Sequence, residues 1–427
     1  MSAALSRPIE ASGARETERQ REERARAYAT PLEAFNPADN QLFREDVHWP
    51  YFERLRAEAP VHYCSTHPEF PYWSVTKYHD IMAVDTNHQD FSSEPTIVLP
   101  DPDEDFTLPM FIAMDPPKHD EQRKTVSPIV APDNLARMES IIRERAAGLL
   151  DACPRGEVFD WVDAISIELT TQMLATLFDF PWEDRRKLTR WSDVATAAPD
   201  SGIVESEDHR RAELMECLAY FTNLWNERAK QTEPKFDLIS MMARGESTKN
   251  MQPMEYLGNL ILLIVGGNDT TRNSISGGLY ALNKFPEQYD KLRANPALIP
   301  SMVSEIIRWQ TPLAYMRRRA TRDIEMRGQT IREGDRVLMW YVSGNRDDEV
   351  IENPNEFIID RPNVRRHLSF GFGIHRCVGN RLAELQLRIV WEEILKRFPR
   401  IDVVDEPRRV MSSFVKGYEY MPVLIPN

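Results

Sequence analysis

One of the four cysteines lies in a segment that suits an anionic sulfur. Cys377 follows the run Phe370-Gly-Phe-Gly-Ile-His-Arg and precedes a helical pattern that begins near Asn380. Backbone N–H groups at a helix N-terminus lower the pKa of a thiol, and the glycines at 371, 373 and 379 let main-chain amides approach the sulfur. A thiolate held in this way can serve as an axial ligand to iron. The alternative is a small buried cysteine beside a flexible turn.

An acid and an alcohol, Asp269 and Thr270, stand side by side in a long helical pattern, Met254–Phe285. Gly266 and Gly267 precede them within the helix, and each glycine costs about 1 kcal/mol relative to alanine. The two glycines indicate either close packing of another helix or the approach of a flat group or small molecule to the backbone. A carboxylic acid beside a hydroxyl can relay and position protons, which is a general acid–base task.

Four basic side chains could together bind an anionic group, because Arg and His donors pair well with carboxylates. They are His119 and Arg123, which are four residues apart on one helix face, Arg318, and His375. Arg318 is the middle of three consecutive arginines. For the outer two, Arg317 and Arg319, a solvated basic face is expected.

The spacing FxxGxxxCxG, complete at Phe370, Gly373, Cys377 and Gly379, resembles the haem-binding signature of the cytochrome P-450 family. The resemblance implies haem b (iron protoporphyrin IX) as the cofactor and Cys377 as its proximal thiolate, whose electron donation favours cleavage of the O–O bond. It also implies that Phe370 packs on the ligand side of the haem, beside Gly371 and Gly379. The residues that would hold the haem propionates are His119, Arg123, Arg318 and His375.

The run Gly266-Gly267-Asn268-Asp269-Thr270-Thr271 resembles the oxygen-activation motif of the same family, in which the helix opens beside the distal face of the haem. By this resemblance Asp269 relays protons from solvent. Thr270 would keep a proton in place by hydrogen bonding during oxygen activation. No role follows for Asn268.

Glu305 and Arg308 are three residues apart and share a helix face. Taken alone, such a pair is a solvated ion pair worth well under about 1 kcal/mol. In the family, however, ExxR is a structural network on the proximal side, and the resemblance makes Arg361 its third charged partner.

Most of the elements that must position these residues are helices. Apolar residues recur at three- and four-residue intervals in Leu135–Leu150, Ala164–Phe178, Ala212–Arg228, Met254–Phe285, Ile299–Trp309 and Arg381–Phe398. Short strand patterns lie at Val61–Tyr63, Tyr72–Val75, Thr330–Ile331, Arg336–Met339 and Tyr420–Ile425. The prediction is a mainly α fold with small β-sheets. By resemblance it is the cytochrome P-450 fold, with the haem between the long central helix and the Cys-ligand loop.

The 427 residues, 42% hydrophobic and 28% charged, show no internal repeat and no linker, so we expect a single catalytic domain over residues 31–427. Residues 1–30 are expected to form a polar, solvated arm, either loose or helical. The longest apolar run, Leu260–Val265, is far shorter than the roughly 20 residues needed to cross a bilayer. The sequence contains no CxxC pair, which argues against a zinc knuckle. A net charge of -14 disfavours nucleic-acid binding. A cytoplasmic enzyme is expected.

Six arginines and a single acid, Glu384, lie between Arg361 and Arg388, around the thiolate loop of a chain that is acidic as a whole. Complementary charge steers docking, and bacterial relatives of this family take electrons from an acidic ferredoxin on the proximal face. No flavin-binding segment is visible in the sequence. The resemblance therefore implies a separate ferredoxin and an NAD(P)H-dependent ferredoxin reductase.

Apolar pieces of a substrate pocket are expected at Pro95–Pro100, Leu108–Met114, Leu313–Ala314 and Phe414, although each fits a structural core equally well. The amino-acid sequences of segments 266–274 and 108–117 resemble those of the bacterial P-450 subfamily that hydroxylates terminal carbons of medium-chain alkanes and fatty acids. The predicted reaction inserts one atom of O2 into an unactivated C–H bond at that position. The alternatives are a monooxygenase for a terpene or other cyclic substrate, a peroxide-driven enzyme, which usually lacks the acid–alcohol pair, and a haem-based sensor without turnover.

Overall fold

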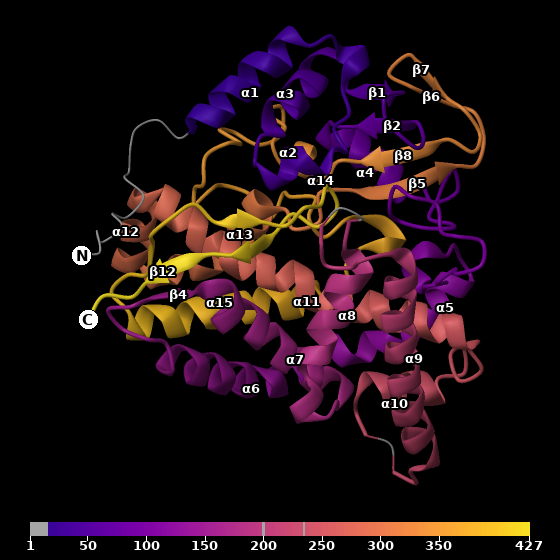
Figure 1. Ribbon diagram of the computed structural model, residues 1–427, viewed down its shortest axis with the longest axis vertical. Coiled ribbons are helices and arrows are strands. Elements are labelled where there is room, and N and C mark those ends of the chain that lie inside the picture. The colour runs from indigo at the N-terminus through magenta and orange to yellow at the C-terminus, as the bar shows by residue number, and fades with distance from the viewer. Residues whose placement is uncertain (1–15, 199–200, 234) are drawn as a thin grey trace.

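One long helix, α11 (Pro253–Lys284), runs through the middle of the computed structural model, which describes residues 16–198, 201–233 and 235–427 (Figure 1). Pro253 is tolerated in its first turn because the N–H that proline lacks would have no partner there. Pro286, which follows the C-cap Phe285, cannot continue the helix. Most residues of α11 are buried, so other elements enclose it.

The predicted helices are confirmed, and they pack around α11. They are α6 (Pro132–Asp151), α7 (Glu168–Phe178), α9 (Glu207–Lys230), α13 (Ile299–Gln310) and α15 (Asn380–Arg397). A π-helical turn, Val162–Ile167, leads into α7. The helices α7, α9, α13 and α15 contact α11, while α6 packs on α15.

Several shorter helices complete the helical part. They are α1 (Glu18–Ala29), α2 (Asn40–Arg44), α3 (Trp49–Glu58), α4 (Tyr78–Thr86), α5 (Lys118–Val126), α8 (Arg186–Thr196), α10 (Leu238–Arg244), α12 (Pro286–Ala294) and α14 (Tyr341–Gly344). Of these, α8 packs directly on α11. No helix of the described residues is long and apolar enough to cross a membrane.

The largest sheet has the strand order β1-β2-β8-β5-β3. Its strands are β1 (Val61–Cys64), β2 (Tyr72–Val75), β8 (Arg336–Met339), β5 (Met316–Ala320) and β3 (Phe91–Ser92). The pair β2 and β8 is parallel and the other pairs are antiparallel. Small sheets are formed by β4 (Val158–Asp160), β12 (Pro422–Leu424) and β9 (Asp402–Val403), by β6 (Ile324–Met326) and β7 (Gln329–Ile331), and by β10 (Arg408–Arg409) and β11 (Tyr418–Tyr420).

The strand β5 contains the three consecutive arginines, where the sequence predicts no strand. β5 lies between β8 and the short edge strand β3, and its residue Arg317 is completely buried, so the expected solvated position is wrong for this residue. Arg319 stays partly exposed. Three consecutive arginines lack the alternation of apolar and polar residues that predicts a strand, so this strand can be recognised only from its pairing with neighbouring strands.

The N-terminal arm is helical in the part that the structure describes. Thr17 and Gln20 form a capping box at the start of α1. The helix is not freely solvated, because Ala27 is buried and Arg24 binds Glu53 of α3 at 2.7 Å. Residues 1–15 of the predicted arm lie outside the described residues.

Candidate active site

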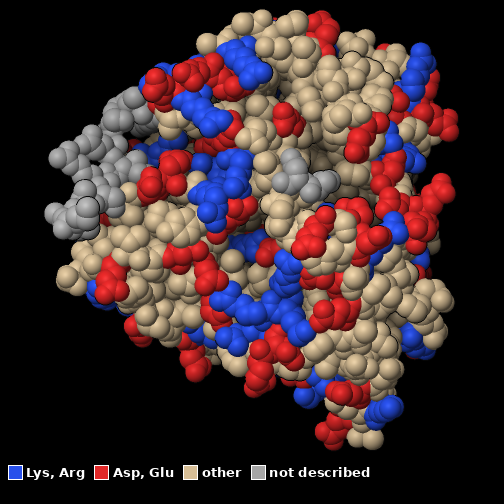
Figure 2. Space-filling view, viewed as in Figure 1, with Lys and Arg blue, Asp and Glu red and all other residues tan. Residues whose placement is uncertain are grey.

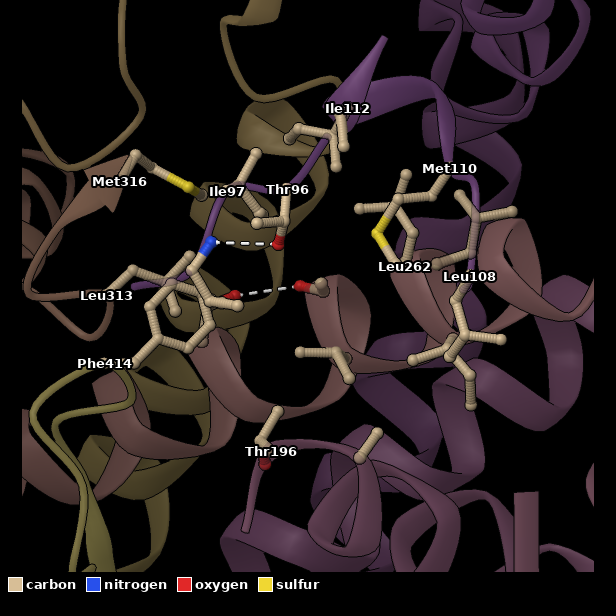
Figure 3. Close-up of a pocket in the computed structure, with 18 of the residues that line it drawn as sticks. Thr96, Ile97, Leu108, Met110, Ile112, Thr196, Leu262, Leu313, Met316 and Phe414 are labelled. Carbon is tan, nitrogen blue, oxygen red and sulfur yellow. Dashed lines mark hydrogen bonds between the residues drawn. The ribbon is translucent and has the colours of Figure 1, made fainter. Parts of the chain in front are cut away.

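A cavity of about 1390 Å³ is bordered by α11 and by the loop that precedes α15. Gly266 and Thr270 of α11 line it, and so does Cys377. Much of the remaining wall is apolar and comes from residues 95–114, from Leu313 and from Phe414 (Figure 3). The fold thus brings together reactive groups that lie far apart in the chain.

The segments predicted to form a pocket line this cavity, with one exception. Residues 95–100 and 108–114, Leu313 and Phe414 all border it. Ala314 does not, because it is fully buried in an apolar cluster with Trp340. Successive side chains of an extended segment point to opposite faces, which separates Ala314 from Leu313.

The loop around Cys377 is held by its backbone and by its glycines. The Cys377 N–H donates to the carbonyl of Phe370 at 2.8 Å. Gly371 and Gly373 both have a φ of 64°, a left-handed conformation that glycine adopts freely. A Cβ on Gly373 would lie 2.8 Å from the Asp85 carbonyl oxygen. These two glycines are therefore required by the turn and by packing on α4, not by contact with the sulfur.

Cys377 is exposed to the cavity, which protein surrounds. Desolvation by this surrounding protein raises the pKa of the thiol above its usual value, while the backbone N–H groups of Gly379 and Asn380 and the charges of Arg123 and Arg376 lower it. The loop thus acts on the pKa in the direction that the sequence predicts, and desolvation opposes it. Metal binding releases the proton, since the thiolate is the ligand form.

The four basic side chains predicted to bind an anion gather at the border of the cavity. Arg123, Arg318 and His375 line it, and His119 packs edge-on against His375 with ring centroids 4.3 Å apart. Arg318 is oriented by a 2.8 Å ion pair with Asp85. Two nitrogens, His119 Nε2 and His375 Nδ1, are buried without a hydrogen-bond partner among the described residues. His375 Nδ1 can donate to an anionic ligand such as a carboxylate from the neutral ring. The Nδ1 of His119 already donates to Asp120 at 2.7 Å, so His119 Nε2 can donate only when the ring is protonated.

Asp269 is fully buried and does not itself line the cavity. Its carboxylate accepts a hydrogen bond from Ser192 at 3.0 Å and pairs with Arg272 at 3.1 Å. Burial raises the pKa of Asp269, although Arg272 opposes the shift. The Thr196 hydroxyl, 3.4 Å from the carboxylate, borders the cavity and links Asp269 to it (Figure 3).

Thr270 faces the cavity, and its hydroxyl donates to the Gly266 carbonyl at 2.9 Å. The helix α11 is continuous at this point, so the opening of the helix implied by the resemblance is not seen. An added Cβ at Gly266 would meet nothing within 4 Å, whereas at Gly267 it would lie 2.7 Å from Leu174 of α7. Gly266 thus leaves its backbone open to a ligand, and Gly267, which also borders the cavity, leaves room for the Leu174 side chain.

Asn268, which has no role from sequence, supports Asp269. Its side-chain oxygen accepts a hydrogen bond from Thr170 of α7 at 2.8 Å, and its amide group donates to Asp269 at 3.2 Å. Sequence reasoning missed Thr170, Ser192 and Thr196, because they lie on α7 and α8 and no local spacing connects them to α11.

Glu305 and Arg308 form a buried ion pair at 2.7 Å, and Arg361 binds the same carboxylate at 3.1 Å. Arg308 also donates to the backbone carbonyls of Asn345 and Pro354. The third partner implied by the resemblance is thus present, and the solvated pair is excluded. This network ties α13 to the segment that leads into the Cys377 loop.

Comparison with known proteins identifies the family. The model of the family described as Cytochrome P450 matches residues 157–415. This chain belongs to the cytochrome P450 family. Linalool 8-monooxygenase of Pseudomonas putida is 34% identical over 90% of this chain and 97% of its own length. Methyl-branched lipid omega-hydroxylase of Mycobacterium tuberculosis is 32% identical over 89% and 91%, respectively.

A solved P450 structure, CYP153D17 from Sphingomonas sp. PAMC 26605, shares the fold with a TM-score of 0.87. It is 50% identical to this chain, and the match covers 93% of this chain and all of the other, 100%. The predicted P-450 fold and its mainly helical class are therefore confirmed. The chain is a monooxygenase of the P450 type, and its cofactor is haem b.

The residues around the cavity fit an iron porphyrin. Cys377 presents a sulfur, the soft ligand that haem-thiolate proteins use. Gly266 leaves an open patch of helix backbone where a flat ring can approach. Arg123 and Arg318 carry the charge opposite to that of the propionates.

The arginines around the Cys377 loop differ in exposure, and two of the six do not fit the predicted docking patch. Arg361 is buried in the Glu305 network, and Arg388 pairs with Glu139 at 3.2 Å. The other four are exposed and form no ion pair with any described residue. We call them the proximal arginines: Arg365, Arg366, Arg376 and Arg381.

Lys and Arg side chains also gather over α7 and α8 on the face shown in Figure 2. These cations are paired with acids: Lys187 binds Glu216 at 2.7 Å, and Arg186 binds Asp163 at 2.9 Å. Their charge is balanced locally, unlike that of the proximal arginines.

Proposed function

We propose that this P450 hydroxylates the terminal carbon of medium-chain alkanes or fatty acids in the cytoplasm. One atom of O2 enters the C–H bond, and the other leaves as water with two electrons and two protons. The proposal rests mainly on segments 108–117 and 266–274, whose amino-acid sequences resemble those of the terminal-hydroxylase subfamily. Both segments contribute to the wall of the same cavity. The M. tuberculosis relative, named an omega-hydroxylase, supports the same reaction.

The cavity wall suits an alkyl chain. Figure 3 shows Leu108, Met110 and Leu262 on one side and Leu313 and Phe414 on another. Such a lining offers contacts to methylene groups and excludes water from the reacting carbon. A chain that fills it would reach Thr270 with one end.

Haem, when bound, supplies the activation of O2 that allows attack on a C–H bond. In this proposal Cys377 is the iron ligand, Phe370, Gly371 and Gly379 lie beside it, and the propionates are held by His119, Arg123, Arg318 and His375. Phe370 and Gly371 line the cavity with Cys377, as the role requires. The buried nitrogens without partners on His119 and His375 support the assignment of the propionate site.

Asp269 and Thr270 manage the protons in this proposal. The raised pKa of Asp269 brings its protonated form closer to neutral pH. Thr196 gives this buried acid a hydroxyl contact to the cavity. Thr270 presents its own hydroxyl directly to the cavity and can position a proton there. Because the acid–alcohol pair is present, the proposal favours O2 over peroxide as the oxidant.

The electrons come, in this proposal, from a ferredoxin that is reduced by an NAD(P)H-dependent ferredoxin reductase. The four proximal arginines support an acidic partner, because their charge is not balanced by acids among the described residues. Complementary charge would guide the ferredoxin to the side of the Cys377 loop.

Product analysis tests the proposal. The purified enzyme, ferredoxin and reductase are incubated with NAD(P)H and, separately, octane, a C12 fatty acid and a cyclic terpene. We expect octane or the fatty acid to be hydroxylated at the terminal carbon. Products hydroxylated only within the chain would contradict the proposal.

Two alternatives are separated by the same assay. A terpene hydroxylase is supported by the P. putida relative, named linalool 8-monooxygenase, and it would convert the terpene alone. A haem-based sensor would bind CO but consume no NAD(P)H in response to any substrate.

The ligand assignment has its own test. The reduced, CO-treated protein should show the red-shifted Soret band of thiolate-ligated haem, and Cys377→Ala should abolish that band. Persistence of the band in the variant would refute the role of Cys377.

A further inference from the structure

Residues 97–101 form a wall of the cavity without belonging to any helix or strand. Ile97 lines the cavity together with Leu313, Met316 and Phe414, and Figure 3 shows Leu313, Met316 and Phe414 on the same side of the view as Ile97. A loop in such a position moves unless other parts of the protein hold it. The question is therefore what fixes the wall segment.

The side chain of Arg317 provides most of the hold. Its guanidinium donates to the carbonyls of Val98 at 3.2 Å, Leu99 at 2.9 Å and Pro100 at 3.3 Å, and to the carboxylate of Asp101 at 2.6 Å. Its backbone N–H also donates to the Ile97 carbonyl at 2.8 Å. One residue thus contacts every residue of the wall segment.

Arg317 is itself fixed in place. It is fully buried in β5, where it pairs with Leu338 of β8 in the middle of the largest sheet. Asp101 is bound by Arg319 at 3.0 Å and by Arg336 as well. Although partial burial raises the pKa of Asp101, the guanidiniums of Arg317 and Arg336 hold it below its usual value. The wall segment is therefore attached to two strands of the largest sheet by charge-assisted hydrogen bonds.

Arg317 does not line the cavity, so it touches neither the substrate nor the cofactor. We propose that Arg317 is a positioning residue that determines which carbon of the substrate is oxidised, by holding residues 97–101 as a fixed cavity wall. The proposal rests on the proposed function for the kind of substrate, an alkyl chain. Neighbouring carbons of such a chain differ only in how they pack, so a wall that shifts by the size of a methylene changes the site of attack.

The test compares Arg317→Gln with Arg319→Gln. Both residues lie on β5 and both bind Asp101, but only Arg317 bonds to the carbonyls of residues 98–100. We expect Arg317→Gln to lower the ratio of terminal to in-chain product about tenfold, the discrimination that one methylene provides. Arg319→Gln should keep the wild-type ratio. In amide hydrogen exchange, the peptide that covers residues 94–107 should exchange faster in Arg317→Gln only.

A conservative variant guards against simple unfolding. Arg317→Lys retains a positive charge but has one nitrogen in place of the two that bind the carbonyls of residues 98–100 and the Asp101 carboxylate at the same time. We therefore expect an intermediate ratio and an unchanged CO spectrum. If Arg317→Gln does not fold, the lysine variant decides. A wild-type ratio and wild-type exchange in the folded variants would overturn the proposal.

The outcome for Arg317 is separable from that for the proposed function. The wild-type enzyme alone reveals whether terminal hydroxylation occurs. If the wild-type enzyme oxidises another carbon or a terpene, the proposed function fails. The ratio of its main product to its minor products can still be compared between the wild type and Arg317→Gln.

Discussion

Removing the carboxylate of Glu305 should destabilise the fold strongly. In Glu305→Gln the guanidiniums of Arg308 and Arg361 lose the negative charge that they share at 2.7 and 3.1 Å inside the protein. Breaking a buried ion pair by removing one partner costs about 3 to 5 kcal/mol. With about 2.1 cal/mol/K of unfolding entropy per residue, the 427 residues give about 0.9 kcal/mol/K. The melting temperature should therefore fall by about 3 to 6 °C.

Differential scanning calorimetry of haem-loaded protein at equal occupancy measures this shift. The matched control is Asp360→Asn, which breaks the exposed 2.9 Å pair between Lys291 and Asp360. Exposed pairs contribute at most about 1 kcal/mol, so the control should melt within about 1 °C of the wild type. If Glu305→Gln also melted within that interval, the buried network would not stabilise the protein as argued.

Three further predictions concern other parts of the molecule. Burial lowers the pKa of Lys416 to about 7, so between about pH 7 and 10 the unfolded chain binds a proton that the folded chain does not, and stability rises with pH. Lys416→Met should therefore gain unfolding free energy over the wild type at pH 7, and the gain should shrink towards pH 10 in urea titrations; a constant difference would contradict this. Thr270→Ala should yield more peroxide per NAD(P)H consumed while the Soret band persists, and unchanged coupling would remove Thr270 from the mechanism. Arg365→Glu with Arg366→Glu should raise the ferredoxin concentration for half-maximal rate about tenfold at low salt, whereas Arg190→Glu on α8 should not.

The sequence predicts the parts of the site that depend on local spacing. Cys377 and its loop, the Glu305–Arg308 pair and the Asp269–Thr270 pair each occupy one short segment. The structure places Cys377 and Thr270 on the wall of one cavity and buries the Glu305–Arg308 pair. Long helices are predicted well for a similar reason, since a 3.6-residue period repeats several times within each.

The misses come from contacts between distant segments. Arg317 was expected in solvent because its run of arginines has no apolar alternation, yet its partner Asp101 comes from a loop far earlier in the chain. The lowering of the Cys377 pKa by its loop is local, whereas the desolvation that opposes it comes from distant segments around the cavity. Ser192 was missed because only the packing of α8 on α11 brings it to Asp269.

In the proposed mechanism, the residues around Asp269 link the fit of the substrate to the efficiency of electron use. Ser192 and Thr196, which hold its carboxylate, both belong to α8. A substrate too bulky for the cavity would push α8 outward and break the hydrogen bonds from both hydroxyls to Asp269. We expect such substrates to be oxidised poorly and to consume reducing equivalents without forming product.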